Sequence, residues 1–485
     1  MSTDGSPAEA RPLRVLHVGN IANNAYLLAK AQRERGIDAV VVSPRPPFIM
    51  GFPDWEEVSF TLHNQHRPHD ITGSTVDGTE FTSPDWFMSG SWDAISTELA
   101  GVWRSEPRTS QPGGMRHALE RRLDRSWPWI RKTLISVIPP SWKPRLASTF
   151  LYIARRRLAN DQAIADAMAL ADIVHLYGPS ADIADHAPTG TPVVALEHGT
   201  LRDFVWASTP ASRAAANGYQ RADRVILTNQ DCLAPAQRLG IPRSRLLLSP
   251  HLSVSAPLHR ARLLRADLLS GDARVMRTIL IPARHTQPSA VDVGKGTDEI
   301  LRCIASLAQE FTDVRFQLVD WGDFTTRSRQ AIRRAGLDER VEWLPLLSRP
   351  LLQQYMARAH CVIDQLTIPA YGGITSDCLG IGVPVITAHD CDIDTAYFGC
   401  CAPVLPARDS EQAHVETVRV LQTTFDASAY FHESTAWYDH FLSSGVALNA
   451  SLSAYAGLVG EDRLPALEAV PPLHDGPSTF SNHAR

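Results

Sequence analysis

Short apolar runs alternate with amphipathic stretches throughout the second half of the chain. Runs typical of buried strands occur at TILIPAR, VRFQLVDWG, RVEWLPLL, HCVIDQ, VPVITA and APVLPA. Between them, TDEILRCIASLAQEF, RSRQAIRRAGL and RPLLQQYMARA place apolar residues at helical spacing. Strict alternation of strand and helix is typical of a doubly wound parallel sheet, so residues 274–425 are predicted to form a Rossmann-like domain.

The first half repeats this pattern at wider intervals. The run LRVLHVG is followed by the loop NIANN, the helical stretch AYLLAKAQRERG and the run DAVVVS, which together predict a βαβ unit with a right-handed crossover. Further strands are expected at ADIVHLYG, TPVVALEHG and ADRVILTN. Residues 13–254 are therefore predicted to form another Rossmann-like domain, and the fold class is α/β with two parallel-sheet domains.

The region 60–161 matches neither pattern and is predicted to be an insertion in the first domain. Its first part, 61–115, is rich in His, Ser, Thr, Gly and Pro, which predicts an irregular loop. Its second part, 116–157, carries 11 Lys and Arg but only 2 Asp and Glu, interleaved with tryptophans. Basic amphipathic helices of this kind can lie on anionic membrane surfaces; the alternative is a solvated basic face on helices that pack against the sheet.

Four further segments lie outside the alternating pattern. Residues 255–273 are rich in arginine and are predicted to be an interdomain linker, whereas 426–463 read as helical. The first 12 residues and the tail 464–485 contain prolines and small polar residues, so both ends are predicted to be disordered.

The composition is that of an ordinary globular protein. The chain has 485 residues, of which 44% are apolar and 20% charged, enough for two separate cores. A net charge of −5 argues against a general nucleic-acid-binding protein. No apolar h-region of a signal peptide follows the N-terminal MSTDGSPAEARP, and no run approaches the roughly 18 apolar residues of a membrane span. We therefore expect a cytoplasmic protein.

The seven cysteines contain no CxxC pair, and several fall inside apolar strand or helix patterns. They are interpreted as reduced core residues. The nearest approximation to a zinc-ligand set is His389 with Cys391, Cys400 and Cys401, which lacks the short regular spacing of zinc sites. The acidic residues within 390–394 are as easily solvated loop acids as metal ligands, and no metal site is expected.

The stretch 361–387, CVIDQLTIPAYGGITSDCLGIGVPVIT, carries the clearest chemistry. It predicts a buried strand, a glycine-containing loop, a short helix and a second strand, with the loop at the edge where open α/β sheets bind ligands. Gly372 and Gly373 let the backbone approach a ligand, and the following helix offers free N–H groups to an anion. Asp377, one turn inside that helix, can accept hydrogen bonds from vicinal hydroxyls such as those of a ribose.

Two cations lie at the carboxyl ends of strands in the same predicted sheet. Arg284 ends the run TILIPAR, and Lys295 precedes the helix TDEILRCIASLAQEF. Two cations, a helix N-terminus and a carboxylate for sugar hydroxyls together suit a nucleoside diphosphate.

The chain resembles the retaining glycosyltransferases of family 4, which have the GT-B fold of two facing Rossmann-like domains. The resemblance rests on PAR followed by KGTDEIL, on VEWLPLLSRPLLQQYMARAHCVIDQ and on YGGITSDCLGIGVPVI, and more weakly on HVGNIANNAYLLAKAQRERGIDA and ALEHGT. These segments span most of residues 13–400 apart from the insertion. The resemblance implies transfer of a sugar from a nucleotide-diphosphate donor, with retention of anomeric configuration and without a metal ion or cofactor.

The resemblance also implies roles for particular residues. Arg284 and Lys295 would bind the donor diphosphate and stabilise the charge that builds up on it as the sugar leaves. His198, at the end of a predicted strand, would face the donor sugar at the reaction centre. Gly19 begins a loop that would approach the cleft, and the helices over 426–463 would cross back onto the first domain.

One departure from the family concerns two glutamates, separated by seven residues, that bracket the donor loop. The second falls on Asp377, which would bind the ribose, but the first falls on Pro369, which has no side-chain acceptor. The donor sugar would then be bound by other groups, such as the backbone N–H groups of Tyr371 to Ile374.

Two alternatives follow from this departure. A catalytically inactive sugar-nucleotide-binding subunit would account for Pro369. A nucleotide-sugar epimerase with the same two-domain fold would need a pair of acid and base carboxylates near the sugar. For a transferase, the acceptor would be a glycan, a lipid-linked sugar or a small molecule, and neither the sugar nor the base follows from the sequence.

Overall fold

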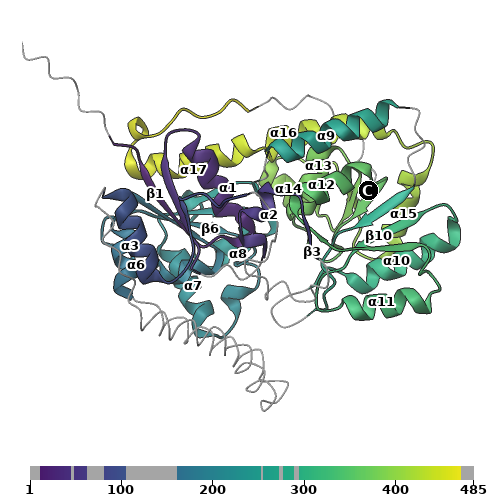
Figure 1. Cartoon of the computed structure of the whole chain (residues 1–485), viewed down its shortest axis with the longest axis horizontal. Helices are drawn as coiled ribbons and strands as arrows, with labels where there is room; N and C mark the ends of the chain where they lie inside the picture. The colour runs from purple at the N-terminus through teal and green to yellow at the C-terminus, as the bar shows by residue number, and fades with distance from the viewer. Residues whose placement is uncertain are drawn as a thin grey trace, which may run out of the picture.

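The computed structural model describes residues 11–44, 49–62, 81–104, 161–252, 255–271, 277–288 and 294–470. In these ranges the chain forms two α/β domains that lie side by side (Figure 1). The expected fold class, with two parallel-sheet domains, is confirmed. The basic segment 116–157 lies outside the described residues, as do most of the two chain ends.

The N-terminal sheet has the strand order β4-β2-β1-β5-β6-β7-β8, and its strand pairs are parallel. Its strands are β1 (Arg14–Val18), β2 (Asp38–Val42), β4 (Phe87–Met88), β5 (Ile173–Tyr177), β6 (Val193–Glu197), β7 (Arg224–Leu227) and β8 (Leu246–Leu248). Leu16 and Val40 join one buried cluster, whereas their neighbours Val15 and Val41 join another. Because successive strand residues point to opposite faces, the sheet is covered on both sides.

The C-terminal sheet has the order β11-β10-β9-β13-β14-β15 and is also parallel. Its strands are β9 (Thr278–Ile281), β10 (Arg315–Val319), β11 (Val341–Leu344), β13 (Cys361–Ile363), β14 (Val385–Thr387) and β15 (Leu405–Pro406). All six fall within the apolar runs that predicted them. Leu280 and Val362 join one buried cluster, whereas Ile279 and Ile363 join the cluster on the opposite face.

The helices alternate with these strands in both domains. Those of the N-terminal domain are α1 (Asn24–Arg33), α2 (Asp54–Glu57), α3 (Trp92–Trp103), α6 (Asp161–Met168), α7 (Pro210–Arg221) and α8 (Leu233–Arg238). Those that follow are α9 (Ser255–Ser270), α10 (Thr297–Glu310), α11 (Thr325–Arg334), α12 (Arg349–Arg358), α13 (Gly373–Ile381), α14 (Cys391–Phe398), α15 (Ser410–Leu421), α16 (Ala427–Phe441) and α17 (Ser444–Val459).

Two segments are more ordered than their composition predicted. Part of the expected irregular loop forms β4 and α3, whose Ile95, Leu99 and Trp103 are buried at helical spacing. The expected linker forms α9, which contacts α12 and α13. Its Arg265 is buried and donates to the Ala359 carbonyl at 2.8 Å, so this arginine binds the end of α12 rather than solvent.

The last two helices join the domains. Helix α16 packs on α13 of the C-terminal domain, whereas α17 packs on α1, β7 and β8 of the N-terminal domain (Figure 1). By length and composition, the stretch Ala427–Val459 could span a membrane, although the sequence was expected to contain no such run. Its Trp437 and Tyr455 are buried against the two domains, as in the core helices of globular proteins. Residues 464–470, predicted to be disordered, lie against α17.

One segment of the N-terminal domain reaches across to the C-terminal domain. This crossing segment, residues 49–62, includes α2 and ends in β3 (Thr61–Leu62), which pairs antiparallel with β12 (Leu346–Leu347). The pairing is extended by the Ser348 N–H, which donates to the Phe60 carbonyl at 3.0 Å. In Figure 1, β3 lies between the two lobes.

A buried polar network links α17 to the N-terminal sheet and predicts pH-dependent stability. His17 donates to Gln32 (2.9 Å) and accepts from Tyr177 (2.8 Å), while His175 accepts from Tyr455 (2.7 Å). Burial lowers the pKa of His17 to about 4 and that of His175 well below its usual value of 6.5. Because both histidines are neutral in the folded protein, the stability they contribute is complete above about pH 6.5 and is lost as the pH falls toward 4.

We expect the melting temperature to fall between pH 7 and pH 5, with His17 alone contributing up to about 3 kcal/mol at the acid end of its titration. Glu56, whose folded pKa is raised to about 7, acts in the opposite direction, because its protonation favours the folded state. Calorimetry of the wild type and His17→Gln at both pH values tests this. The variant should show a shallower pH dependence, and equal slopes would contradict the assignment.

Candidate functional site

A cavity of about 170 Å³ lies between the two domains. Its walls include residues that follow the carboxyl ends of strands in both sheets: Ala22 after β1, His198 after β6, Pro282 after β9 and Trp321 after β10. Open α/β sheets bind ligands at these ends of their strands. The crossing segment also lines the cavity, through Met50, Trp55 and Glu56.

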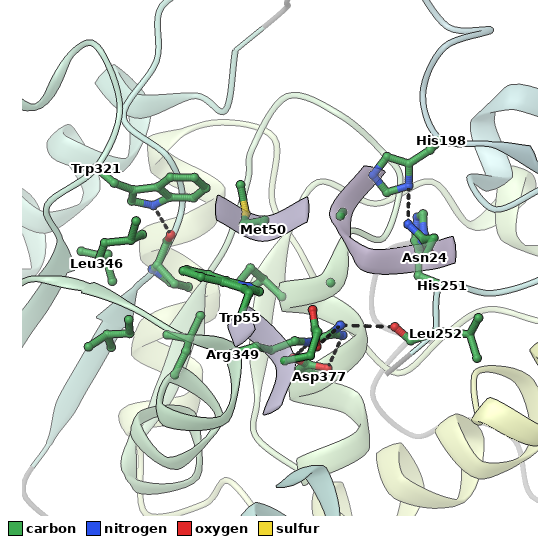
Figure 2. A pocket seen from close by; sticks show the side chains of 18 residues that line it. Asn24, Met50, Trp55, His198, His251, Leu252, Trp321, Leu346, Arg349 and Asp377 are labelled. Carbon is green, nitrogen blue, oxygen red and sulfur yellow. Dashed lines mark hydrogen bonds and ion pairs between the residues drawn. The ribbon is translucent and has the colours of Figure 1, made fainter. Parts of the chain in front are cut away.

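One side of the cavity is apolar and aromatic. Figure 2 shows Trp55, Met50, Trp321 and Leu346 grouped there, away from His198. The Trp321 indole is fixed by a 2.9 Å hydrogen bond from Nε1 to the Pro282 carbonyl. Such a surface suits a flat ring or an apolar chain, because aromatic side chains contribute large contact areas with defined geometry.

The other side carries a buried ion-pair network around Arg349, the first residue of α12. Its Nε and Nη2 each donate to Asp377 at 2.9 Å, and its Nη1 donates to Glu56 (3.3 Å) and to the Leu252 carbonyl (3.2 Å). Gln353 also donates to Asp377 at 3.0 Å. Burial raises the pKa of Glu56 to about 7, although Arg349 favours its charged form. Arg349 therefore joins α13 to the crossing segment of the other domain.

Neither Arg349 nor Glu56 was recognised from the sequence. The motif SRP, with arginine and proline in the first turn of a predicted helix, is the only local signal for Arg349. Glu56 has no local signal, because its partner Arg349 lies 293 residues further along the chain. Asp377, predicted to bind a ribose, lines the cavity with its carboxylate already bound by Arg349 and Gln353.

His198 lines the cavity at the end of β6, where its sequence position placed it. The Asn24 side-chain amide donates to His198 Nδ1 at 3.3 Å, which leaves the ring proton on Nε2, directed toward the cavity in Figure 2. Burial lowers the pKa of His198 to about 4, with further lowering by the positive charges of Arg202 and Lys295. The histidine is therefore a neutral hydrogen-bond donor at physiological pH.

His251, which was not predicted, lines the cavity beside His198. The two rings lie 4.6 Å apart in an edge-to-face arrangement. His251 Nε2 lies 3.4 Å from the Asn229 side-chain oxygen, whereas Nδ1 is buried and has no hydrogen-bond partner among the described residues. The motif SPHLS that contains it carries no glycine or helix start that could have marked it as part of a site.

The loop after β1 approaches the cavity in a strained conformation. Gly19 has φ +85°, and a side chain there would contact the Ser180 hydroxyl. Ala22 and Asn23 follow with φ of 47° and 55°, a left-handed conformation that costs alanine about 1 kcal/mol or more. Asn23 compensates by donating to the Phe52 carbonyl of the crossing segment at 2.8 Å. The strained turn places Ala22 in the cavity wall.

The predicted donor loop leads into α13, with Gly372 at its N-cap and Gly373 as its first residue. Gly373 and Ile374 line the cavity, so the free N–H groups of this helix lie at its edge. Tyr371 does not line the cavity: its ring is buried, and its N–H donates to Gln230 of the N-terminal domain at 3.2 Å. Pro369 lies in the same loop and offers no polar side-chain atom.

The two predicted phosphate-binding cations lie beside the cavity rather than in its wall. The Lys295 ammonium donates to the Gln365 side chain, and it is close enough to His198 to lower the pKa of that histidine. Residues from opposite domains, Lys295 and His198, are thus brought together. Arg284 follows β9 and packs with its side chain against Gly322 of the turn after β10.

The cysteines divide into two groups. Four are buried core residues, as expected: Cys232, Cys303, Cys361 and Cys378. Cys400 is half-buried against the C-terminal core, whereas Cys391 is exposed and Cys401 half-buried, so the core interpretation is wrong for this last pair. The structure pairs Cys391 with Cys401 as a disulfide, with Cα atoms 5.2 Å apart, whereas Cys400 remains free.

No protein-family model matches this sequence, and no curated protein matches it significantly. Solved structures are nevertheless similar over nearly the whole chain. HepE of Anabaena, in complex with UDP and glucose, superposes with a TM-score of 0.53 at 14% identity, covering 92% of this chain and 100% of HepE. A glycosyltransferase from Rickettsia africae superposes with a TM-score of 0.52 at 12% identity, covering 93% of this chain and 99% of that protein. At these identities the likeness establishes the architecture, and the chain has the GT-B fold.

Proposed function

We propose that this protein is a glycosyltransferase that binds a nucleoside diphosphate sugar in the interdomain cavity and transfers the sugar, with retention of configuration, to an acceptor. The observation that supports this most strongly is the meeting of groups from opposite domains. Neutral His198 faces the cavity from one sheet, and the N-terminus of α13 faces it from the other. The narrower assignment to family 4 is part of the proposal.

In the proposed complex, different groups bind the diphosphate, the sugar and the base of the donor. The N–H groups at the start of α13, together with Lys295 and Arg284, would bind the diphosphate and stabilise its charge as the bond to the sugar breaks. His198 would donate from Nε2 to the sugar. The aromatic side of the cavity, with Trp321, would accept the base. HepE has been crystallised with UDP-glucose, which makes a uridine nucleotide the first donor to test.

The contacts of the predicted donor-binding residues favour a second candidate, a sugar-nucleotide-binding protein without transferase activity. Asp377 would have to exchange the hydrogen bonds from Arg349 and Gln353 for those from a ribose. Tyr371 uses its N–H to bind Gln230, and Pro369 has no acceptor. A protein with these features would bind the nucleotide through its phosphates and base without positioning the sugar for transfer.

Incubation with radiolabelled nucleotide sugars, beginning with UDP-glucose, distinguishes the candidates. We expect a released nucleoside diphosphate and a labelled acceptor when membrane lipids or glycans are supplied. Calorimetry with UDP measures binding separately, with Lys295→Ala as the matched variant that should bind more weakly, since a charge-assisted contact contributes about 1.5–3 kcal/mol. Binding without transfer supports the second candidate, and no binding of any nucleoside diphosphate contradicts both.

A further inference from the structure

A cluster that the proposed transfer does not use lies beside Tyr371 of the donor loop. It consists of His389, Cys391 and Cys401. His389 follows β14, Cys391 is the first residue of α14, and Cys401 follows the turn at Gly399 that reverses the chain after this helix. One ring nitrogen of His389 and the two sulfurs all lie within 4.8 Å of one another. Their sequence spacing resembles no common zinc motif, but folding brings their ligand atoms to one place.

The hydrogen bonds of His389 fix which of its nitrogens is available. Tyr371 donates its hydroxyl proton to Asp394, and its oxygen lies 2.9 Å from His389 Nδ1, which therefore donates to it. Asp394 Oδ2 is also only 3.5 Å from Nδ1. With the proton on Nδ1, Nε2 carries a free lone pair. A hydrogen-bonded carboxylate or hydroxyl behind the ring is the usual support of a metal-binding histidine.

Nε2 of His389 is buried and has no hydrogen-bond partner among the described residues. The histidine side chain is only 7% exposed, so water does not readily satisfy this nitrogen. A buried polar atom without a partner costs about 1–3 kcal/mol. A disulfide between Cys391 and Cys401 accounts for the two sulfurs but leaves Nε2 unsatisfied, whereas a metal ion bound by all three side chains satisfies every atom.

The distances suit a soft divalent cation. Zinc bonds of about 2.3 Å to sulfur and 2.0 Å to nitrogen in a tetrahedron place the ligand atoms roughly 3.5–3.8 Å apart. Reduction of the disulfide lets the two sulfurs separate to this spacing, since Cys391 is exposed and Cys401 half-buried, and the histidine nitrogen already lies within 4.8 Å of both sulfurs. Two thiolates balance the charge of the cation, and the nearby guanidinium of Arg408 is already paired with Asp390 at 2.9 Å.

We propose that the reduced protein binds one zinc ion, or another divalent cation that prefers nitrogen and sulfur, through His389 Nε2, Cys391 Sγ and Cys401 Sγ. The cluster of ligand atoms among the described residues does not include the adjacent Cys400, so water completes the fourth position. Each thiol releases one proton when it binds the metal. Exchange with a small-molecule disulfide, which is reduced to two thiols as Cys391 and Cys401 are joined, closes the site, and a phosphine or thiol reductant reopens it. The metal would fasten α14 to the donor loop through Tyr371.

The test is a titration of the full-length protein with Zn²⁺ after reduction with a phosphine, followed by substitution with Co²⁺. We expect one equivalent of zinc per chain and thiolate-to-cobalt charge-transfer absorption. Cys391→Ser, Cys401→Ser and His389→Gln should each lose these signals. Cys400→Ser is the matched control, because it removes the adjacent thiol and should bind the metal normally. Tyr371→Phe should retain the site with roughly 10–100-fold weaker affinity, since it removes the support behind His389.

Three outcomes would overturn the proposal. The first is that the reduced wild type binds no metal. The second is that the variants of the three ligands bind it as tightly as Cys400→Ser. The third is that the free-thiol count shows the Cys391–Cys401 bond intact in the presence of reductant. Because each readout is independent of nucleotide binding, the result does not depend on the proposed transferase activity.

Discussion

Arg349→Ala is expected to lower the free energy of unfolding by about 3–5 kcal/mol, the usual cost of leaving buried charges without a partner. The substitution leaves Asp377 and Glu56, each with a side chain only 2% exposed, without their shared cation. It also removes a contact between the domains. Differential scanning calorimetry should show a melting temperature lower by about 3–5 °C. The loss of unfolding free energy caused by Arg349→Ala should be smaller below pH 7, because Glu56 then takes up a proton and no longer needs the cation.

Arg358→Ala is the matched control for this experiment. Arg358 lies at the other end of α12, is exposed, and donates to the Gln354 carbonyl of its own helix. Its removal should change stability by about 0.5 kcal/mol or less. Combining Arg349→Ala with Glu56→Gln and Asp377→Asn should recover part of the loss, since the uncompensated charges are then absent. Equal melting temperatures for Arg349→Ala and Arg358→Ala would show that the network contributes nothing to stability.

His198→Ala is expected to reduce turnover by about 10²–10³-fold, as for the loss of one donor aimed at a reacting group. Nucleoside diphosphate affinity should change little, because the phosphates are assigned to the other domain. Melting temperature, diphosphate affinity and turnover are measured on one preparation. His259→Ala, which removes an exposed histidine on α9, is the control and should leave all three unchanged. A His198→Ala protein that melts early but turns over normally when kept cold would remove His198 from the site.

The strands could be predicted because their information is local. Runs such as TILIPAR and HCVIDQ are short, apolar and bounded by polar residues, and β9 and β13 form within them. Helix α9 was mistaken for a linker because its arginines suggested a solvated segment. In the folded protein Arg265 is buried by binding backbone carbonyls, an interaction that composition cannot reveal.

The candidate site was only partly predictable, because only some of its residues carry local sequence signals. Glycines and a histidine at strand ends carry local signals, which placed His198 and Gly373 at the cavity wall. The partners of Asp377 carry no such local signal. Arg349 binds Asp377 and Glu56 only when α12 packs beside α13 and the crossing segment reaches α12. Cys391 and Cys401 likewise meet only because the chain reverses at Gly399, which adopts φ +85°.

The pairing of β3 with β12 also bears on how the two lobes can move. The backbone passes between the lobes near residue 252 and again between α16 and α17, and two such connections would let the lobes swing about a hinge. The two-residue ladder, together with Trp55 packed against the C-terminal core, adds an attachment on the cavity side. The pairing resists rotation of one lobe against the other about the two backbone connections. Wide separation of the lobes therefore requires β3 to detach from β12.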